Sequence, residues 1–116
     1  MSAGRAGLST HVLDLVSGRP ASGMTIELWR GGRCLRTVVT NADGRTDAPL
    51  VEGDAFETGE YELLFHVGDY FGRTGSMSSG PFLDRVPVRF TVADRSARYH
   101  VPLLCTPWAY STYRGS

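Results

Sequence analysis

The chain has 116 residues, with 12 basic and 12 acidic side chains and a formal net charge of zero. This length fits one domain, and folding at this size buries roughly 60% of the extended chain's surface, enough for one modest core. All 12 basic residues are arginine, which excludes chemistry that needs a lysine amine. The even charge balance also argues against a dedicated nucleic-acid surface, which would be basic.

Hydrophobic residues make up 41% of the chain and charged residues 21%, as in globular proteins. The segment 1–7 shows no signal-peptide pattern, and we expect it to be flexible. No apolar run approaches the ~20 residues of a membrane span, so no membrane partner is expected. Cys34 and Cys105 are predicted to be reduced thiols that fill small apolar gaps, in a cytoplasmic compartment. No Cys/His spacing resembles a zinc motif, and neither a metal nor a cofactor is expected.

Apolar and polar residues alternate with period two along much of the chain. This alternation is clearest in the segments 9–15, 24–29, 61–67, 86–92 and 99–105. It indicates half-buried β-strands, because successive side chains of a strand point to opposite faces. Turn-forming residues separate these segments, and their spacing predicts seven or eight short strands, which is typical of a β-sandwich.

One short helix is predicted at residues 69–71, directly after the strand that ends at Val67. The Gly/Ser-rich stretch 72–80 is expected to be a loop that leads to the next strand. There is no internal repeat and no linker. The sequence therefore predicts a single all-β domain over residues 8–116.

The three histidines occupy different strand positions. His66 lies beside Glu62 and Leu64, opposite the aromatic core face of its strand, and is predicted to be an ordinary surface or edge histidine. His11 and His100 each lie within an apolar strand, where the simplest interpretation is a half-buried, hydrogen-bonded ring. Because imidazole titrates near neutral pH, these two are also the natural acid–base candidates.

Arg45 follows the turn at residues 43–44. A guanidinium there can clamp an anionic or carbonyl-bearing planar substrate through paired donors, although an exposed turn arginine is the more common case. Asp47 is predicted either to orient an imidazole or to cap the turn. The chain has no nucleophile elbow, HExxH pair or glycine-rich phosphate loop. Composition and spacing alone thus predict no more than a β-sandwich with two candidate histidines.

Several segments, in order along the chain, resemble the transthyretin-related family and specifically its enzyme branch, the 5-hydroxyisourate hydrolases. They are LSTHVLD at 8–14, GRPA at 18–21, DGRTD at 43–47, PFL at 81–83, VPVRF at 86–90, YHVPLL at 99–104 and YRGS at 113–116. The terminal Tyr-Arg-Gly-Ser is the most specific of these. The hormone carriers of the family lack the two strand histidines, the motif arginine and this ending. Cys105 and Thr106 depart from the more common Leu-Ser.

The resemblance implies a transthyretin-like sandwich of two four-stranded sheets. It also implies a homotetramer with a central channel and active sites at the dimer–dimer interface. The implied reaction is the hydrolysis of 5-hydroxyisourate, the first product of urate oxidation, to 2-oxo-4-hydroxy-4-carboxy-5-ureidoimidazoline, without a cofactor. The residues implied are His11, Arg45 and His100 as catalytic groups, with Tyr113, Ser116 and Asp47 at the substrate.

In this implied site His11 and His100 together activate water, and Arg45 stabilises the charge that develops on the attacked carbonyl. Two other functions stay open: a non-catalytic transthyretin-like protein that binds a small aromatic ligand, and a structural sandwich domain with two satisfied core histidines. Which histidine is the general base also stays open, because a sequence gives neither tautomers nor distances.

Overall fold

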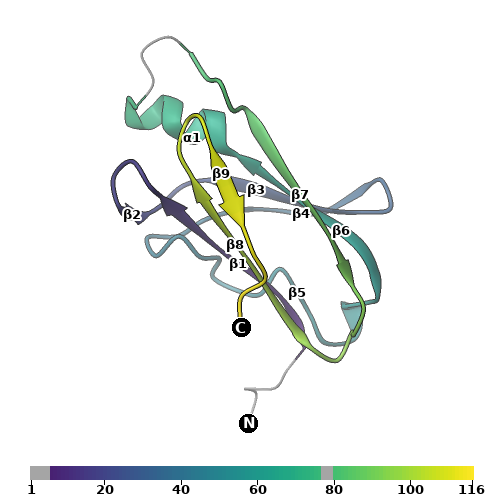
Figure 1. The fold of residues 1–116 in the computed structure, drawn as a ribbon. Helices are drawn as coiled ribbons and strands as arrows, with labels where there is room; N and C mark the ends of the chain where they lie inside the picture. Colours follow the sequence, from purple (N-terminus) through teal and green to yellow (C-terminus); the bar gives the residue numbers. More distant parts are fainter. Residues whose placement is uncertain (1–5, 77–79) are drawn as a thin grey trace.

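The alternating segments fold into two facing β-sheets with one α-helix at one end of the sandwich (Figure 1). The computed structural model describes residues 6–76 and 80–116. Its strands are β1 (Gly7–Asp14), β2 (Arg19–Pro20), β3 (Thr25–Arg30), β4 (Arg33–Val39), β5 (Val51–Glu52), β6 (Gly59–His66), β7 (Arg85–Val92), β8 (Arg98–Cys105) and β9 (Tyr110–Thr112). A 3-10 turn, Gly53–Ala55, follows β5.

One sheet has the order β2-β1-β8-β9, with β5 also paired to β1, and the other has the order β4-β3-β6-β7. The predicted two-sheet sandwich is therefore confirmed. Seven strands in the described residues have three or more residues, and β2 and β5 have two each. Strands of two residues are too short to show an alternating pattern, and the pairing of β5 makes the first sheet five-stranded rather than four-stranded.

The predicted helix is present and longer than expected. Helix α1 spans Val67–Thr74 and takes in residues 72–74, which the sequence had suggested were part of a loop. Residues 77–79 of that loop lie outside the described residues, as do residues 1–5 of the N-terminal segment expected to be flexible. Gly7, the last residue of that segment, is the first residue of β1. Within the described parts of the chain, no helix is long and apolar enough for a membrane span.

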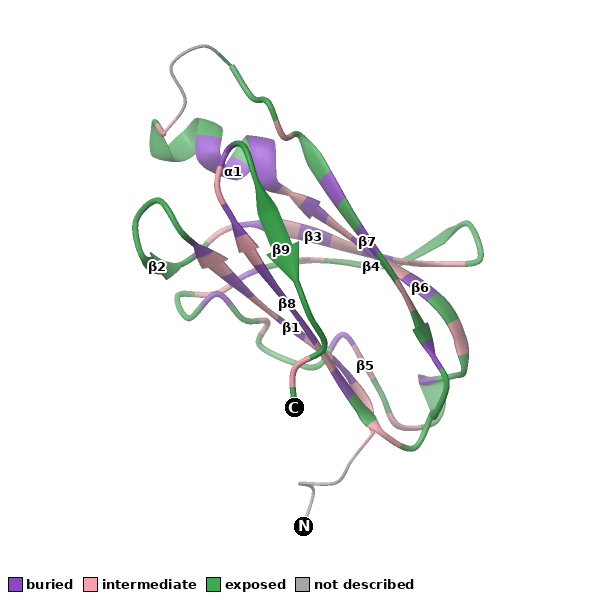
Figure 2. Ribbon diagram, in the orientation of Figure 1, coloured by how far each residue is buried: buried purple, intermediate pink, exposed green. Residues whose placement is uncertain are grey.

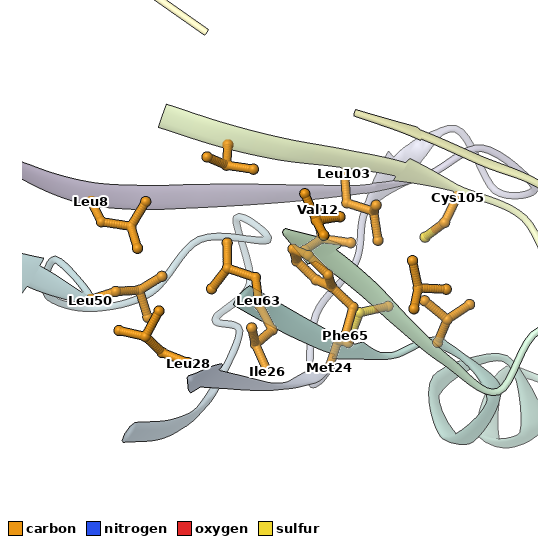
Figure 3. Packing of buried hydrophobic residues seen from close by; sticks show 14 of the residues in the cluster. Leu8, Val12, Met24, Ile26, Leu28, Leu50, Leu63, Phe65, Leu103 and Cys105 are labelled. Atoms are coloured by element: carbon orange, nitrogen blue, oxygen red, sulfur yellow. The ribbon is translucent and has the colours of Figure 1, made fainter. Parts of the chain in front are cut away.

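The space between the sheets is filled by alternate residues of the facing strands (Figures 2 and 3). The core residues labelled in Figure 3 are Leu8, Val12, Met24, Ile26, Leu28, Leu50, Leu63, Phe65, Leu103 and Cys105. Cys105 therefore fills an apolar gap, as predicted. The same prediction is wrong for Cys34, which is exposed because β4 is an edge strand with mostly exposed residues.

The first sheet places β1 and β8 side by side in parallel. Their register pairs Ser9 with His100 and His11 with Pro102. The buried hydroxyl of Thr10 donates a hydrogen bond to the carbonyl of Val101 across the two strands, at 2.7 Å. Because Thr10 faces the core, its neighbours Ser9 and His11 face the opposite side of the sheet, as His100 does. The two candidate histidines thus share the outer face of one sheet.

A buried hydrogen bond ties α1 to the end of β1. The hydroxyl of Tyr70 donates to Asp14 Oδ2 at 2.8 Å, and Asp14 is only 2% exposed. The other oxygen of this carboxyl group accepts the N–H groups of Val16 and Ser17. Burial raises the pKa of Tyr70, and the hydrogen bond to Asp14 adds to the rise.

We expect Tyr70→Phe to lower the free energy of unfolding by about 2 kcal/mol, because a buried carboxyl oxygen loses its hydrogen-bond donor. Urea denaturation of the two proteins measures the difference. Tyr110→Phe on the exposed strand β9 is the matched control and should leave the stability unchanged. Equal midpoints for Tyr70→Phe and the wild type would contradict the structural role of this bond.

Candidate functional site

His100 is held in β8 by its direct neighbour in β1. Ser9 Oγ lies 2.8 Å from Nδ1 of His100, within hydrogen-bond distance for either tautomer of the ring. This contact leaves Nε2 as the ring nitrogen available to other partners. It also restricts rotation of the ring, since a side chain bonded at one nitrogen has fewer accessible rotamers. The pair joins residues that lie 91 positions apart in the sequence.

Arg45 reaches this region because the preceding turn docks on β1. Gly44 is buried with φ of 73°, and a Cβ at this position would lie 2.5 Å from the carbonyl oxygen of Val12. The N–H of Val12 donates to the carbonyl of Gly44 at 2.9 Å. Both the positive φ and the close approach require glycine. The Asp-Gly-Arg order therefore places the arginine directly after a turn that contacts the strand beside His11.

Asn41, which sequence reasoning did not single out, organises this loop. Its Oδ1 accepts the N–H groups of Asp43 at 2.9 Å and Arg45 at 3.2 Å. Its Nδ2 donates to Asp47 Oδ1 at 3.0 Å. An asparagine at the start of a turn-forming sequence is the signal that could have identified it. Asp47 thus supports the loop that carries Arg45, and it does so through Asn41.

Electrostatic interactions connect the two histidines and Arg45. Burial lowers the pKa of His11 and the Arg45 cation adds to the effect, while the hydrogen bond to the main chain of Asp43 opposes it. Burial also lowers the pKa of His100, with further contributions from Arg45 and His11. An imidazole with a lowered pKa is neutral at neutral pH and can accept a proton. The site therefore combines two neutral rings with the permanent cation of Arg45.

A cavity of about 390 Å³ opens beside these groups. Its lining residues are Ser9, Arg45, Arg98, His100 and Ser116. Three of the residues expected from the sequence are thus brought together here: Arg45, His100 and Ser116. His11 is connected to them through its charge interactions with Arg45 and His100. Such a cavity can bind a small polar molecule next to proton-accepting and cationic groups.

Tyr113 and Asp47 are placed elsewhere. Tyr113 lines a second cavity, of about 310 Å³, together with Tyr99 and Arg114. Its side chain is 59% exposed. Asp47 is exposed and bonded to Asn41 in the loop that carries Arg45. Neither residue is among those that line the cavity beside His100.

Sequence reasoning assigned no role to Ser9 or Arg98, although both line the cavity. Period two is the signal that could have found them. Ser9 precedes His11 by two positions and Arg98 precedes His100 by two positions, so each shares the strand face of a candidate histidine. Arg98 adds a second guanidinium to the cavity beside Arg45.

Thr106 stands where the family more often has serine, and it keeps a hydroxyl group at this position. Thr106 Oγ1 accepts the N–H groups of Trp108 and Ala109, at 3.0 and 2.9 Å, in the turn between β8 and β9. A serine would offer the same acceptor, so the turn needs only a short hydroxyl side chain. Cys105 stands where the family more often has leucine. Burial raises the pKa of its thiol to about 12, which makes this thiol a poor nucleophile.

The prediction for His66 is wrong. His66 ends β6, an interior strand of the second sheet, and its side chain is only 13% exposed. Its Nε2 lies 2.5 Å from Glu27 Oε2, and Trp29 Nε1 donates to the other oxygen of Glu27 at 2.8 Å. The hydrogen bond from His66 lowers the pKa of Glu27. His66 lies in the other sheet from His11 and His100 and takes no part in their cavity.

Residues 8–115 match the model of the family described as HIUase/Transthyretin. The chain is 55% identical to a 5-hydroxyisourate hydrolase of Deinococcus radiodurans, over 97% of this chain and 98% of that protein. It is also similar to the solved structure of Klebsiella pneumoniae 5-hydroxyisourate hydrolase, with 37% identity, a TM-score of 0.78, and coverage of 96% of this chain and 99% of that one.

A solved transthyretin is similar in fold but more distant in sequence. The crystal structure of transthyretin from Sparus aurata matches with a TM-score of 0.85 and 27% identity, over 96% of this chain and 97% of that one. The sandwich is common to both branches, whereas the sequence is nearer to the hydrolase of Deinococcus radiodurans, at 55% identity. The family match extends over nearly the whole described fold, from β1 to the tail beyond β9. This chain therefore belongs to the HIUase/Transthyretin family.

Proposed function

We propose that this chain hydrolyses 5-hydroxyisourate. The reaction opens the six-membered ring at a cyclic amide bond and yields 2-oxo-4-hydroxy-4-carboxy-5-ureidoimidazoline. The observation that carries this proposal is a polar cavity lined by His100, Arg45 and Ser116, with His11 close enough to His100 and Arg45 to interact electrostatically with both. The 55% identity to the hydrolase of Deinococcus radiodurans supports it.

The two histidines supply the acid–base chemistry. Attack of water on the amide carbonyl requires removal of a proton from the water, and a neutral imidazole accepts it. One of His11 and His100 acts as this base, and the other orients the water or donates a proton to the leaving nitrogen. A positioned acid–base group contributes about 10²–10⁴-fold in rate. The geometry at Nδ1 of His100 leaves its Nε2 free for either role.

Arg45 supplies the positive charge. The carbonyl oxygen becomes an oxyanion as water adds, and a guanidinium that is charged at every relevant pH stabilises it. Loss of one oxyanion donor typically costs about 3–4 kcal/mol of transition-state stabilisation. Ser116 in the cavity and Tyr113 on the tail are the proposed substrate contacts, and Asp47 supports Arg45 through the loop.

The proposed assembly is a homotetramer in which the active sites lie between dimers. Large apolar side chains exposed on the single chain support a role for neighbouring subunits: Leu15, Val16, Trp108, Tyr110 and Tyr113. Light scattering is expected to give the mass of four chains, and a monomer would favour a structural sandwich domain instead. The cytoplasmic location expected from the two cysteines stays a prediction, and both thiols are free.

The proposed activity is tested with 5-hydroxyisourate made freshly from urate. Purified protein should accelerate the loss of its ultraviolet absorbance above the rate in buffer. A rate equal to that in buffer would overturn the proposal. Equilibrium binding of small aromatic ligands without hydrolysis would then favour the non-catalytic binding protein.

The pH dependence follows from the two histidines. Both have a pKa below the ordinary value of 6.5, so both are neutral at pH 7 and become protonated only as the pH falls below that value. We expect kcat/KM to be constant near neutral pH and to decline on the acid side, with a midpoint below pH 6.5. The profile is measured with the spontaneous decay subtracted at each pH. An acid midpoint above 6.5 would contradict the role of a neutral histidine as base.

A further inference from the structure

The C-terminal tail beyond β9 is fixed to β8 by an arginine that the proposed function leaves without a role. The guanidinium carbon of Arg114 lies 3.9 Å from the centre of the Tyr99 ring, and its Nη2 donates to the carbonyl of Arg98 at 3.1 Å. A guanidinium stacked on an aromatic face is attracted by the ring electrons and keeps its N–H groups free for hydrogen bonds in its plane. Arg114 makes both kinds of contact at once.

Tyr99 is a rigid platform for this stack. Its side chain is only 6% exposed, and its ring packs edge-on against Phe56 with centroids 5.7 Å apart. Its hydroxyl accepts the N–H groups of Ala93 and Asp94, at 3.0 and 3.2 Å. The ring is therefore held at both ends, and a group bound to its face takes a defined position. Tyr99 also immediately precedes His100 in β8.

The next residue of the tail lies against His100 itself. The N–H of Gly115 donates to the carbonyl of His100 at 2.7 Å. A Cβ on Gly115 would lie 2.7 Å from Cδ2 and 3.3 Å from Cγ of the imidazole. The backbone of the tail thus packs on the ring, and only glycine leaves room for it. With Ser9 bonded to Nδ1, the imidazole is confined by both β1 and the tail.

We propose that Arg114 is a positioning residue whose stack on Tyr99 holds the tail in place. The clamp keeps Gly115 against the imidazole of His100 and Ser116 in the lining of the cavity. Arg114 itself acts through these two neighbours. The kinetic consequence rests on the proposed hydrolase function, whereas the clamp is a property of the folded chain and can be measured without turnover.

The test compares Arg114→Met and Arg114→Lys with the wild type. Methionine keeps an apolar stem without the charge, and lysine keeps the charge without the planar stack. Arg33→Met, at an exposed position of the β3–β4 hairpin, is the matched control. The first measurement is amide hydrogen exchange at Gly115. We expect exchange to be at least about tenfold faster in Arg114→Met, intermediate in Arg114→Lys and unchanged in the control.

The second measurement is steady-state hydrolysis by the same proteins. Arg114→Met is expected to lower kcat/KM about 10–100-fold, with most of the loss in kcat, because a displaced imidazole is out of reach of its reaction partner. Arg114→Lys should recover part of the loss. The thermal midpoint should change little, since Arg114 is exposed.

Gly115→Ala is an independent variant that leaves Arg114 intact. Its added methyl group should displace the imidazole, shift the NMR signals of His100 and lower kcat. Unchanged exchange at Gly115 in Arg114→Met would overturn the clamp. Faster exchange with unchanged kcat/KM would overturn the positioning role. If the wild type does not hydrolyse 5-hydroxyisourate, the proposed function fails, and the exchange measurement still decides whether the clamp exists.

Discussion

His100→Ala is expected to lower kcat for 5-hydroxyisourate by about 10²-fold or more. The imidazole is one of the two groups proposed to activate water, and a positioned acid–base group contributes about 10²–10⁴-fold. Its orientation is fixed by Ser9 at Nδ1 and by the tail against the ring. The decay of substrate absorbance under saturating conditions measures the effect.

His66→Ala is the matched control for this variant. It also removes an imidazole, but from the second sheet, where the ring bonds Glu27. Activity per folded molecule should therefore be preserved in His66→Ala and lost in His100→Ala. Wild-type kcat in His100→Ala would remove this residue from the reaction.

The corresponding variant His11→Ala decides which ring is the base. The acid decline of kcat/KM reports protonation of the base in the free enzyme. The variant that lacks the base should lose this decline along with most of its rate, whereas the other variant should keep it. The decline must therefore persist in one of the two variants if a single histidine is the base.

Arg45→Met is expected to have two separate effects. The first is a fall in kcat/KM of about 10²–10³-fold, because the developing oxyanion loses a charged donor. The second is a rise in the pKa of both histidines. The Arg45 cation disfavours a second positive charge nearby and so lowers the pKa of His11 and His100. Without it, both imidazolium ions form at higher pH, and the acid decline should move toward higher pH.

The pH profile and an NMR titration of the histidine rings together measure this second effect. Arg45→Lys separates charge from geometry. It keeps the cation, so the histidine pKa values should stay lowered, but it lacks the planar pair of donors and should still lose rate. An acid decline that does not move in Arg45→Met would show that the guanidinium has no electrostatic influence on the rings.

The sequence predicted the sandwich because alternation with period two is a local property. Each strand that buries one face must carry apolar residues at every second position, whatever its neighbours are. In β1 the alternation separates Thr10 and Val12 from Ser9 and His11, and the burial of the folded strand shows that the first pair faces the core. It could not distinguish an edge strand from an interior one. That is why Cys34 on β4 and His66 on β6 were assigned the wrong environments.

The position of Arg45 was predictable only in part. The Asp-Gly-Arg order predicted a turn, since glycine tolerates positive φ. It could not show that Gly44 packs on the carbonyl of Val12, because this contact joins two segments through the fold. The role of Asn41 in holding both Arg45 and Asp47 follows from the same packing.

The sequence by itself determined a small domain whose basic residues are all arginine, the alternation of its strands, and the residue types available for chemistry: two strand histidines, a turn arginine and a terminal Tyr-Arg-Gly-Ser. The size of the domain gave little room for a deep pocket. Only the tertiary structure decided that the groups meet. Parallel pairing of β1 with β8 puts Ser9 beside His100, and the tail returns across β8 to the same ring. Contacts between residues so far apart in the sequence depend on which strands pair and in which register. The local alternation of apolar and polar residues does not specify which strands pair.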